Sequence, residues 1–189
     1  MSTIIIVHGT NGNPDENWFP WLEKELEKRG FTVAVPQFPT PNGQTIENWM
    51  KTLAPFREDF GSDTILVGHS LGVPFILHVL ETLDKTIAAA FLIAGFTGPL
   101  GGKNDPLNAS IAEGDFNWGV IRKNCRKFFT YYSDNDTRVP KEKTQGLAKR
   151  LYAEERLIPG AGHFNTAAGF SAFPELLEDI LHVFEDRKL

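Results

Sequence analysis

Cysteine, basic charge and long apolar runs are all scarce in this sequence of 189 residues. The one cysteine, Cys125, excludes an intramolecular disulfide, which fits a reducing compartment. The apolar run Ile4–Val7 has no basic residue before it and is too short for a signal peptide or a membrane span. We therefore expect a cytoplasmic protein without a membrane partner.

Basic residues are also outnumbered, with 19 Lys and Arg against 24 Asp and Glu and a formal net charge of -5. No basic stripe overrides this balance, so a nucleic-acid partner is not expected. The sequence contains no H-E-x-x-H motif and no cluster of His and Cys with the spacing of metal ligands. We therefore expect no metal site.

What the sequence does contain is a regular alternation of short apolar runs with amphipathic runs, over a length that suits one domain spanning residues 1–189. Such alternation predicts an α/β fold: a parallel sheet of about six strands with helices on both faces. The expected strands are 4–7, 31–35, 64–67, 87–93, 127–132 and 154–158, the expected helices are 18–29, 46–56, 71–83, one starting at Pro140 and 174–185, and residues 95–120 are expected to be mostly loop.

The third expected strand runs directly into Gly68-His69-Ser70-Leu71-Gly72, a G-x-S-x-G sequence followed by an apolar helix. This strand–turn–helix context is that of a nucleophile elbow in the α/β-hydrolase fold, in which a sharp turn exposes the serine hydroxyl above the sheet. The glycines leave room for the turn. We predict that Ser70 is a nucleophile.

A nucleophilic serine needs a base, and the base needs an acid that orients it. In this fold the three residues follow the chain order Ser, Asp or Glu, His. His163 lies in a glycine-rich loop after the last expected strand and is the predicted base. Asp136 lies in the loop after the fifth strand and is the preferred acid, with Asp134 as the alternative.

Acyl transfer also needs two N–H donors for the developing oxyanion. The backbone N–H of Leu71, at a helix N-terminus, is one expected donor. The second should come from the loop after the first strand, where we expect the N–H of Thr10, with Asn11 as the alternative.

Aromatic and polar residues near strand ends are candidates for substrate contact. We expect Phe164, which adjoins the predicted base, together with Trp118 and Asn11, to touch the substrate. The stretch from about Phe96 to Trp118 is the only place for a cap, and its length predicts no separate lid domain. An open site of this kind favours small acyl groups.

These segments together resemble the small α/β-hydrolases related to retinoblastoma-binding protein 9. The resemblance rests on His8-Gly9-Thr10, Asn17-Trp18-Phe19-Pro20-Trp21-Leu22, Val35-Pro36, Asn48-Trp49, the elbow, Ser133-Asp134-Asn135-Asp136 with Val139-Pro140, and Gly162-His163-Phe164. It implies a compact three-layer αβα sandwich, a Ser70–Asp136–His163 triad and no cofactor. The tumour-suppressor partner of the human relative is not implied, because the L-x-C-x-E type of motif is missing here.

The expected function is therefore that of a serine hydrolase, most like a carboxylesterase (EC 3.1.1), which cleaves a small-molecule acyl substrate through an acyl-enzyme. Two alternatives remain at this point. The same triad serves acyltransferases, because fold does not fix function. A protein-interaction module on a hydrolase fold is the other alternative, although the sequence names no protein partner.

Overall fold

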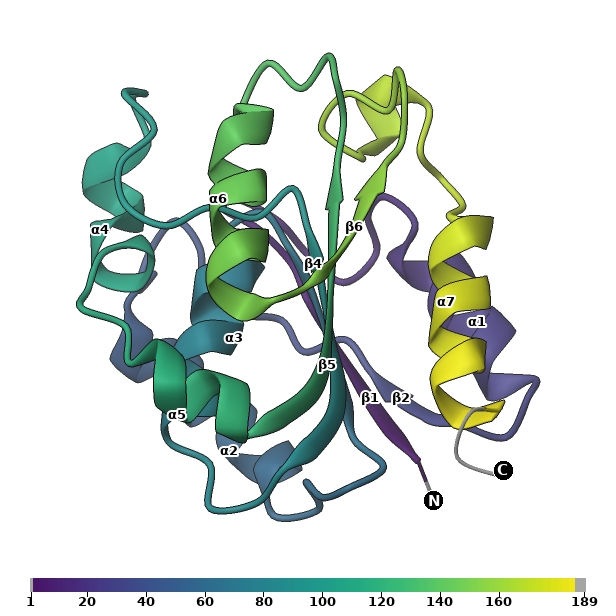
Figure 1. Ribbon diagram of the computed structural model, residues 1–189. Helices are drawn as coiled ribbons and strands as arrows, with labels where there is room; N and C mark the ends of the chain where they lie inside the picture. Colours follow the sequence, from purple (N-terminus) through teal and green to yellow (C-terminus); the bar gives the residue numbers. More distant parts are fainter. Residues whose placement is uncertain (1, 186–189) are drawn as a thin grey trace.

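A computed structural model describes residues 2–185 of the chain and shows one six-stranded parallel sheet with the order β2-β1-β3-β4-β5-β6 (Figure 1). The strands are β1 (Thr3–Val7), β2 (Thr32–Ala34), β3 (Ile65–His69), β4 (Ile87–Ile93), β5 (Cys125–Tyr132) and β6 (Glu154–Leu157). Each pair of neighbouring strands is parallel, so all six carboxyl ends meet at one edge. Ligand sites of open α/β sheets form at this edge.

Helices cover both faces of the sheet and complete three layers (Figure 1). On one face lie α1 (Phe19–Glu27) and α7 (Pro174–Glu185), and on the other lie α2 (Ile46–Arg57), α3 (Gly72–Glu81), α5 (Trp118–Lys123) and α6 (Lys141–Leu151). Within residues 2–185, no helix has the length and apolar character needed to cross a bilayer.

Alternate side chains along a strand point to opposite sides of the sheet, and helices cover both sides. The central strands are therefore buried on both faces. Ile4 and Ile6 of β1 join the core beneath α1 and α7, whereas Ile5 and Val7 join the core beneath α3. All four side chains are at most 1% exposed. This pattern of continuous apolar strands is what the sequence predicted, and the expected α/β-hydrolase fold without a large lid is confirmed.

Residues 95–120 are mostly loop, as expected, but they also include helical stretches that were not expected. The segment contains α4 (Asp105–Ala112) and α5. Several of its Asn, Asp and Pro residues belong to helix starts: the Asn117 side chain accepts a hydrogen bond from the N–H of Val120 at the start of α5, and Pro106 lies in the first turn of α4. The other differences are shifts of one or two residues at element ends and a short 3₁₀ helix at Thr166–Ala168.

Candidate active site

Ser70 occupies the sharp turn between β3 and α3. Its φ is +55°, a left-handed conformation that is strained for a residue other than glycine. The turn is held by the Ser70 N–H, which donates a hydrogen bond of 2.9 Å to the carbonyl of Ile93 at the end of β4. Strained backbone of this kind is common where function requires it.

The two glycines of the elbow are required by close backbone contacts. A Cβ on Gly72 would lie 2.3 Å from the carbonyl oxygen of Val7, and one on Gly68 would lie 3.0 Å from the backbone of Gly72. A third glycine, Gly9, brings the loop after β1 against the serine, because a Cβ there would lie 3.0 Å from the Cβ of Ser70. The sequence-based explanation of the G-x-S-x-G motif thus agrees with the packing.

His163 and Asp136 form a buried pair at the same edge of the sheet. The Nδ1 atom of His163 lies 2.8 Å from Oδ2 of Asp136, and the two side chains are 6% and 3% exposed. The other carboxylate oxygen accepts the backbone N–H groups of Arg138 and Val139 at 2.8 and 3.0 Å. Burial by itself raises the pKa of Asp136, but the hydrogen bonds from His163 and from these N–H groups outweigh it and lower the pKa overall.

Asp134, the alternative acid, makes a different contact. Its carboxylate accepts the N–H of Gly160 at 2.8 Å, and the neighbouring Asn135 accepts the N–H of Gly162 at 2.7 Å. These two bonds tie the loop after β5 to the loop that carries His163. The structure therefore places Asp136, and not Asp134, against the imidazole of His163.

His69, inside the elbow, contacts the loop of the predicted base. Its Nε2 atom lies 2.8 Å from the carbonyl oxygen of His163, and the two rings are 4.9 Å apart. Burial lowers the pKa of His69 to about 3, and the nearby His163 acts in the same direction. A neutral His69 with its proton on Nε2 therefore donates to that carbonyl.

Of the two expected oxyanion donors, Thr10 lines the same cavity as Ser70, and Leu71 directly follows Ser70 in the chain. Leu71 directly precedes α3, where backbone N–H groups are free of helical partners. Thr10 lies in the loop after β1 and lines the cavity. The N–H of Asn11, the alternative donor, is already used, since it donates to Oγ1 of Thr40 at 2.8 Å. The geometry therefore favours Thr10 over Asn11.

A chain of side-chain hydrogen bonds, which we call the α4 network, connects this loop to α4. Oδ1 of Asn108 accepts from Oγ1 of Thr10 at 2.7 Å and from Nε2 of Gln44 at 3.0 Å. Oε1 of Gln44 in turn accepts from Oγ1 of Thr40 at 2.6 Å, and Thr40 accepts the N–H of Asn11. Gln44 and Asn108 are 4% and 5% exposed. Sequence reasoning missed both residues.

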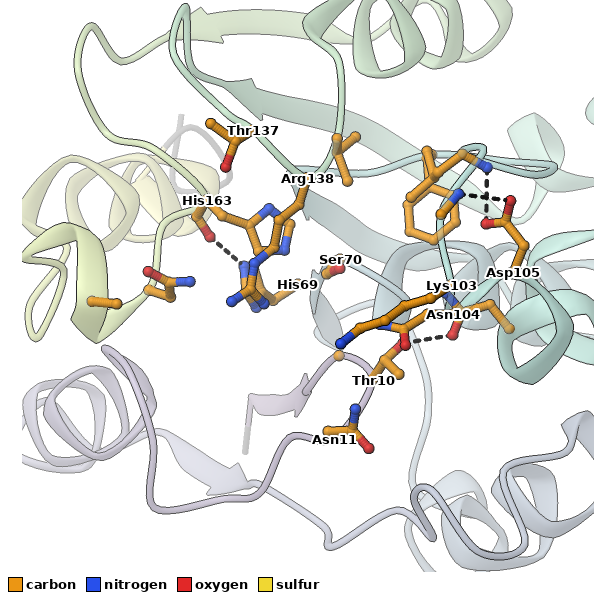
Figure 2. A pocket seen from close by; sticks show the side chains of 18 of the residues that line it. Thr10, Asn11, His69, Ser70, Lys103, Asn104, Asp105, Thr137, Arg138 and His163 are labelled. Atoms are coloured by element: carbon orange, nitrogen blue, oxygen red, sulfur yellow. Dashed lines mark hydrogen bonds between the residues drawn. The ribbon is translucent and has the colours of Figure 1, made fainter.

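Ser70 and His163 line one cavity of about 990 Å³ (Figure 2). Thr10 and Asn11 line it from the loop after β1, and Phe96 lines it from the loop between β4 and α4. Most of the remaining lining is polar. Among residues 2–185, no group of three or more His, Cys, Asp or Glu side chains is placed to hold a metal ion.

Two of the expected substrate contacts are wrong. Phe164 is fully buried and packs on Phe173 beneath the loop, with its carbonyl accepting the indole N–H of Trp18 at 3.1 Å. Trp118 begins α5 and stacks under the guanidinium of Arg150, and it is absent from the cavity lining. Phe164 adjoins His163 in the sequence, but only the side chain of His163 faces the cavity.

Comparison with known proteins gives consistent relatives over nearly the whole chain. The profile of the serine hydrolase family matches residues 4–181. The YdeN protein of Bacillus subtilis is 29% identical over 180 residues, which cover 94% of this chain and 93% of that protein. Serine hydrolase RBBP9 of Rattus norvegicus is 28% identical over 166 residues, with coverage of 85% and 86%. The crystal structure of the Bacillus subtilis ydeN product has a TM-score of 0.93 over 98% of this chain and 100% of that one, at 27% identity.

Proposed function

Since this chain belongs to the serine hydrolase family, we propose that it hydrolyses small carboxylic esters through an acyl-enzyme on Ser70. One observation carries the proposal: His163, which is paired with the buried carboxylate of Asp136, lines the same cavity as a serine on a strained elbow. The resemblance inferred from the sequence motifs agrees with the family match and with the relative RBBP9.

In the acylation half of the proposed reaction, Oγ of Ser70 attacks the ester carbonyl carbon while Nε2 of His163 takes its proton. Asp136 accepts the Nδ1–H of His163, which leaves Nε2 free as a base and stabilises the imidazolium that forms. The carbonyl oxygen becomes an oxyanion between the N–H groups of Thr10 and Leu71. The tetrahedral intermediate then collapses, and the imidazolium gives its proton to the departing alcohol.

In the deacylation half, water replaces the alcohol. His163 takes a proton from the water as its oxygen attacks the acyl carbon, and the second tetrahedral intermediate uses the same two N–H donors. Its collapse breaks the bond to Ser70, and the serine oxygen recovers the proton from His163. The products are the carboxylic acid, the alcohol and the unchanged enzyme.

Small substrates suit the cover over the site. The segment between β4 and β5 supplies only α4 and α5, and only its first part, from Phe96 to Asn108, contributes to the cavity lining. Short acyl esters should therefore react faster than long-chain ones. Much faster cleavage of a long-chain ester would contradict this part of the proposal.

A fluorophosphonate probe tests the serine directly, because such probes label a serine only when its base and oxyanion donors are assembled. We expect one covalent adduct on Ser70, located by peptide mass spectrometry. Ser70→Ala and heat-denatured protein should both lose it, whereas Ser110→Ala, a serine on α4 outside the cavity lining, should keep it. Absence of labelling in native, folded protein would refute the proposal.

A further inference from the structure

Two cationic side chains line the cavity that contains Ser70. Lys103 comes from the loop between β4 and α4, and Arg138 comes from the loop between β5 and α6. In Figure 2, Lys103 reaches from the α4 side towards the middle of the cavity, and Arg138 lies on the side of His163. Sequence analysis singled out neither of them.

Neither cation is neutralised by an ion pair. Within residues 2–185, the salt bridges within 4.0 Å involve other residues and leave the ammonium of Lys103 and the guanidinium of Arg138 unpaired. An unpaired cation beside a cavity is available to a ligand. Arg is well suited to bind a carboxylate through two parallel hydrogen bonds.

Two carboxylates, Asp105 and Glu16, also line the cavity, and neither lies within 4.0 Å of the ammonium of Lys103 or the guanidinium of Arg138. Asp105 is occupied by the backbone N–H groups of Leu100, Gly101 and Gly102, at 2.7 to 3.1 Å. Burial raises the pKa of Glu16, while hydrogen bonds with Asn13 and Asn17 and the charge of Arg138 act in the opposite direction. The N–H donors of Lys103 and Arg138 are therefore not taken up by these carboxylates and remain available to an anionic ligand.

Resting on the proposed function, the geometry points to a substrate class: we propose that the site prefers esters whose acyl part carries a second, free carboxylate. Lys103 and Arg138 bind that carboxylate while the ester carbonyl lies at Ser70. Such substrates are the monoesters of short dicarboxylic acids. The reaction itself is unchanged, and the alcohol leaves as in any other ester.

The test compares two p-nitrophenyl esters with the same reacting carbonyl. One is the mono-ester of glutaric acid, and the other is its methyl-capped, uncharged counterpart. We expect kcat/KM to be about tenfold higher for the charged ester at low ionic strength, as is reasonable for a charge-assisted pair. The preference should shrink in about 0.5 M NaCl, where the Debye length is only a few ångströms.

Variants assign the preference to its residues. Lys103→Met and Arg138→Met should each lower the ratio of the two kcat/KM values about threefold, and the double variant should bring the ratio close to one. Lys149→Met is the matched control, because this exposed cation of α6 lies outside the cavity lining. It should leave the ratio as in the wild type.

Two outcomes would overturn the proposed substrate preference and leave the proposed hydrolase function intact. These are a wild-type ratio near one, or a ratio that survives in the double variant, with ester cleavage and Ser70 labelling intact. If neither ester is cleaved but Ser70 is labelled, protection of the labelling reaction decides: glutarate should slow it more than uncharged glutaramide, and equal protection overturns the proposal. If Ser70 is not labelled at all, the proposed function is refuted, and the substrate preference that rests on it is refuted as well.

Discussion

Replacing Asn108 by alanine should lower kcat while the protein stays folded. Oδ1 of Asn108 accepts two hydrogen bonds, one of them from the side chain of Thr10, whose N–H is a proposed oxyanion donor. Two neutral hydrogen bonds contribute about 1 kcal/mol each to stability. We therefore expect Asn108→Ala to lose about 2 kcal/mol of unfolding free energy, measured by urea denaturation.

The kinetic effect has an upper bound. Complete loss of one oxyanion donor costs roughly 3 kcal/mol of transition-state stabilisation, or more than a hundredfold in kcat. Asn108→Ala leaves the N–H of Thr10 in place and removes only its anchor, so we expect a decrease of about tenfold to a hundredfold. KM should change little, because the oxyanion forms only after the substrate has bound.

A neighbouring residue provides the control. Oγ of Ser110, on the same helix, accepts the N–H of Ile46 at 2.8 Å and ties α4 to α2 without contacting the loop after β1. Ser110→Ala should lower stability by a similar or smaller amount and leave kcat within about twofold. A kcat for Asn108→Ala as close to wild type as that of Ser110→Ala would refute the idea that the α4 network holds the oxyanion loop.

Three further predictions follow from the geometry. His69→Gln should flatten the pH dependence of the unfolding free energy measured by urea denaturation. Below about pH 6.5 the imidazole of His69 takes up a proton in the unfolded chain but not in the folded one, where its pKa is about 3, so this residue lowers the wild-type unfolding free energy by about 1.4 kcal/mol per pH unit. Equal slopes of unfolding free energy against pH in the wild type and the variant would contradict this. Gly72→Ala should prevent stable folding, because its Cβ would meet backbone at 2.3 Å, whereas Gly146→Ala, on a helix with open space, should raise the unfolding free energy by up to about 1 kcal/mol in the same assay. Asp136→Asn should reduce kcat by about a thousandfold or more, and Asp134→Asn by far less; the reverse order in an ester assay would reassign the acid.

The sequence was sufficient to find the residues that gather at the strand ends. Ser70, Asp136 and His163 each follow a strand of a parallel sheet, and the carboxyl ends of such strands meet at one edge whatever the details of packing. The strands themselves were predictable because continuous burial on two faces selects apolar, β-branched runs. The structure brings the three residues to one place, and their catalytic roles remain predictions.

Side-chain directions and long-range contacts were beyond sequence reasoning. Phe164 adjoins His163, yet its left-handed backbone, with φ of +51°, accompanies a side chain that packs into the core. Thr10 and Asn108 are 98 positions apart, and their hydrogen bond depends on how α4 lies against the loop after β1. That helix was not predicted, so no pattern in the sequence pointed to the contact.

The way Asp105 holds the loop before α4 bears on how substrate preference can diverge among relatives. Its carboxylate accepts hydrogen bonds from the backbone N–H groups of residues 100–102, and these bonds do not involve the side chains of residues 103 and 104. Residue 103 can therefore be exchanged while the loop keeps its course and the elbow is left untouched. For laboratory evolution this defines a small library, randomised at Lys103 and Asn104 with Asp105 retained, in which selectivity varies at little expense to folding.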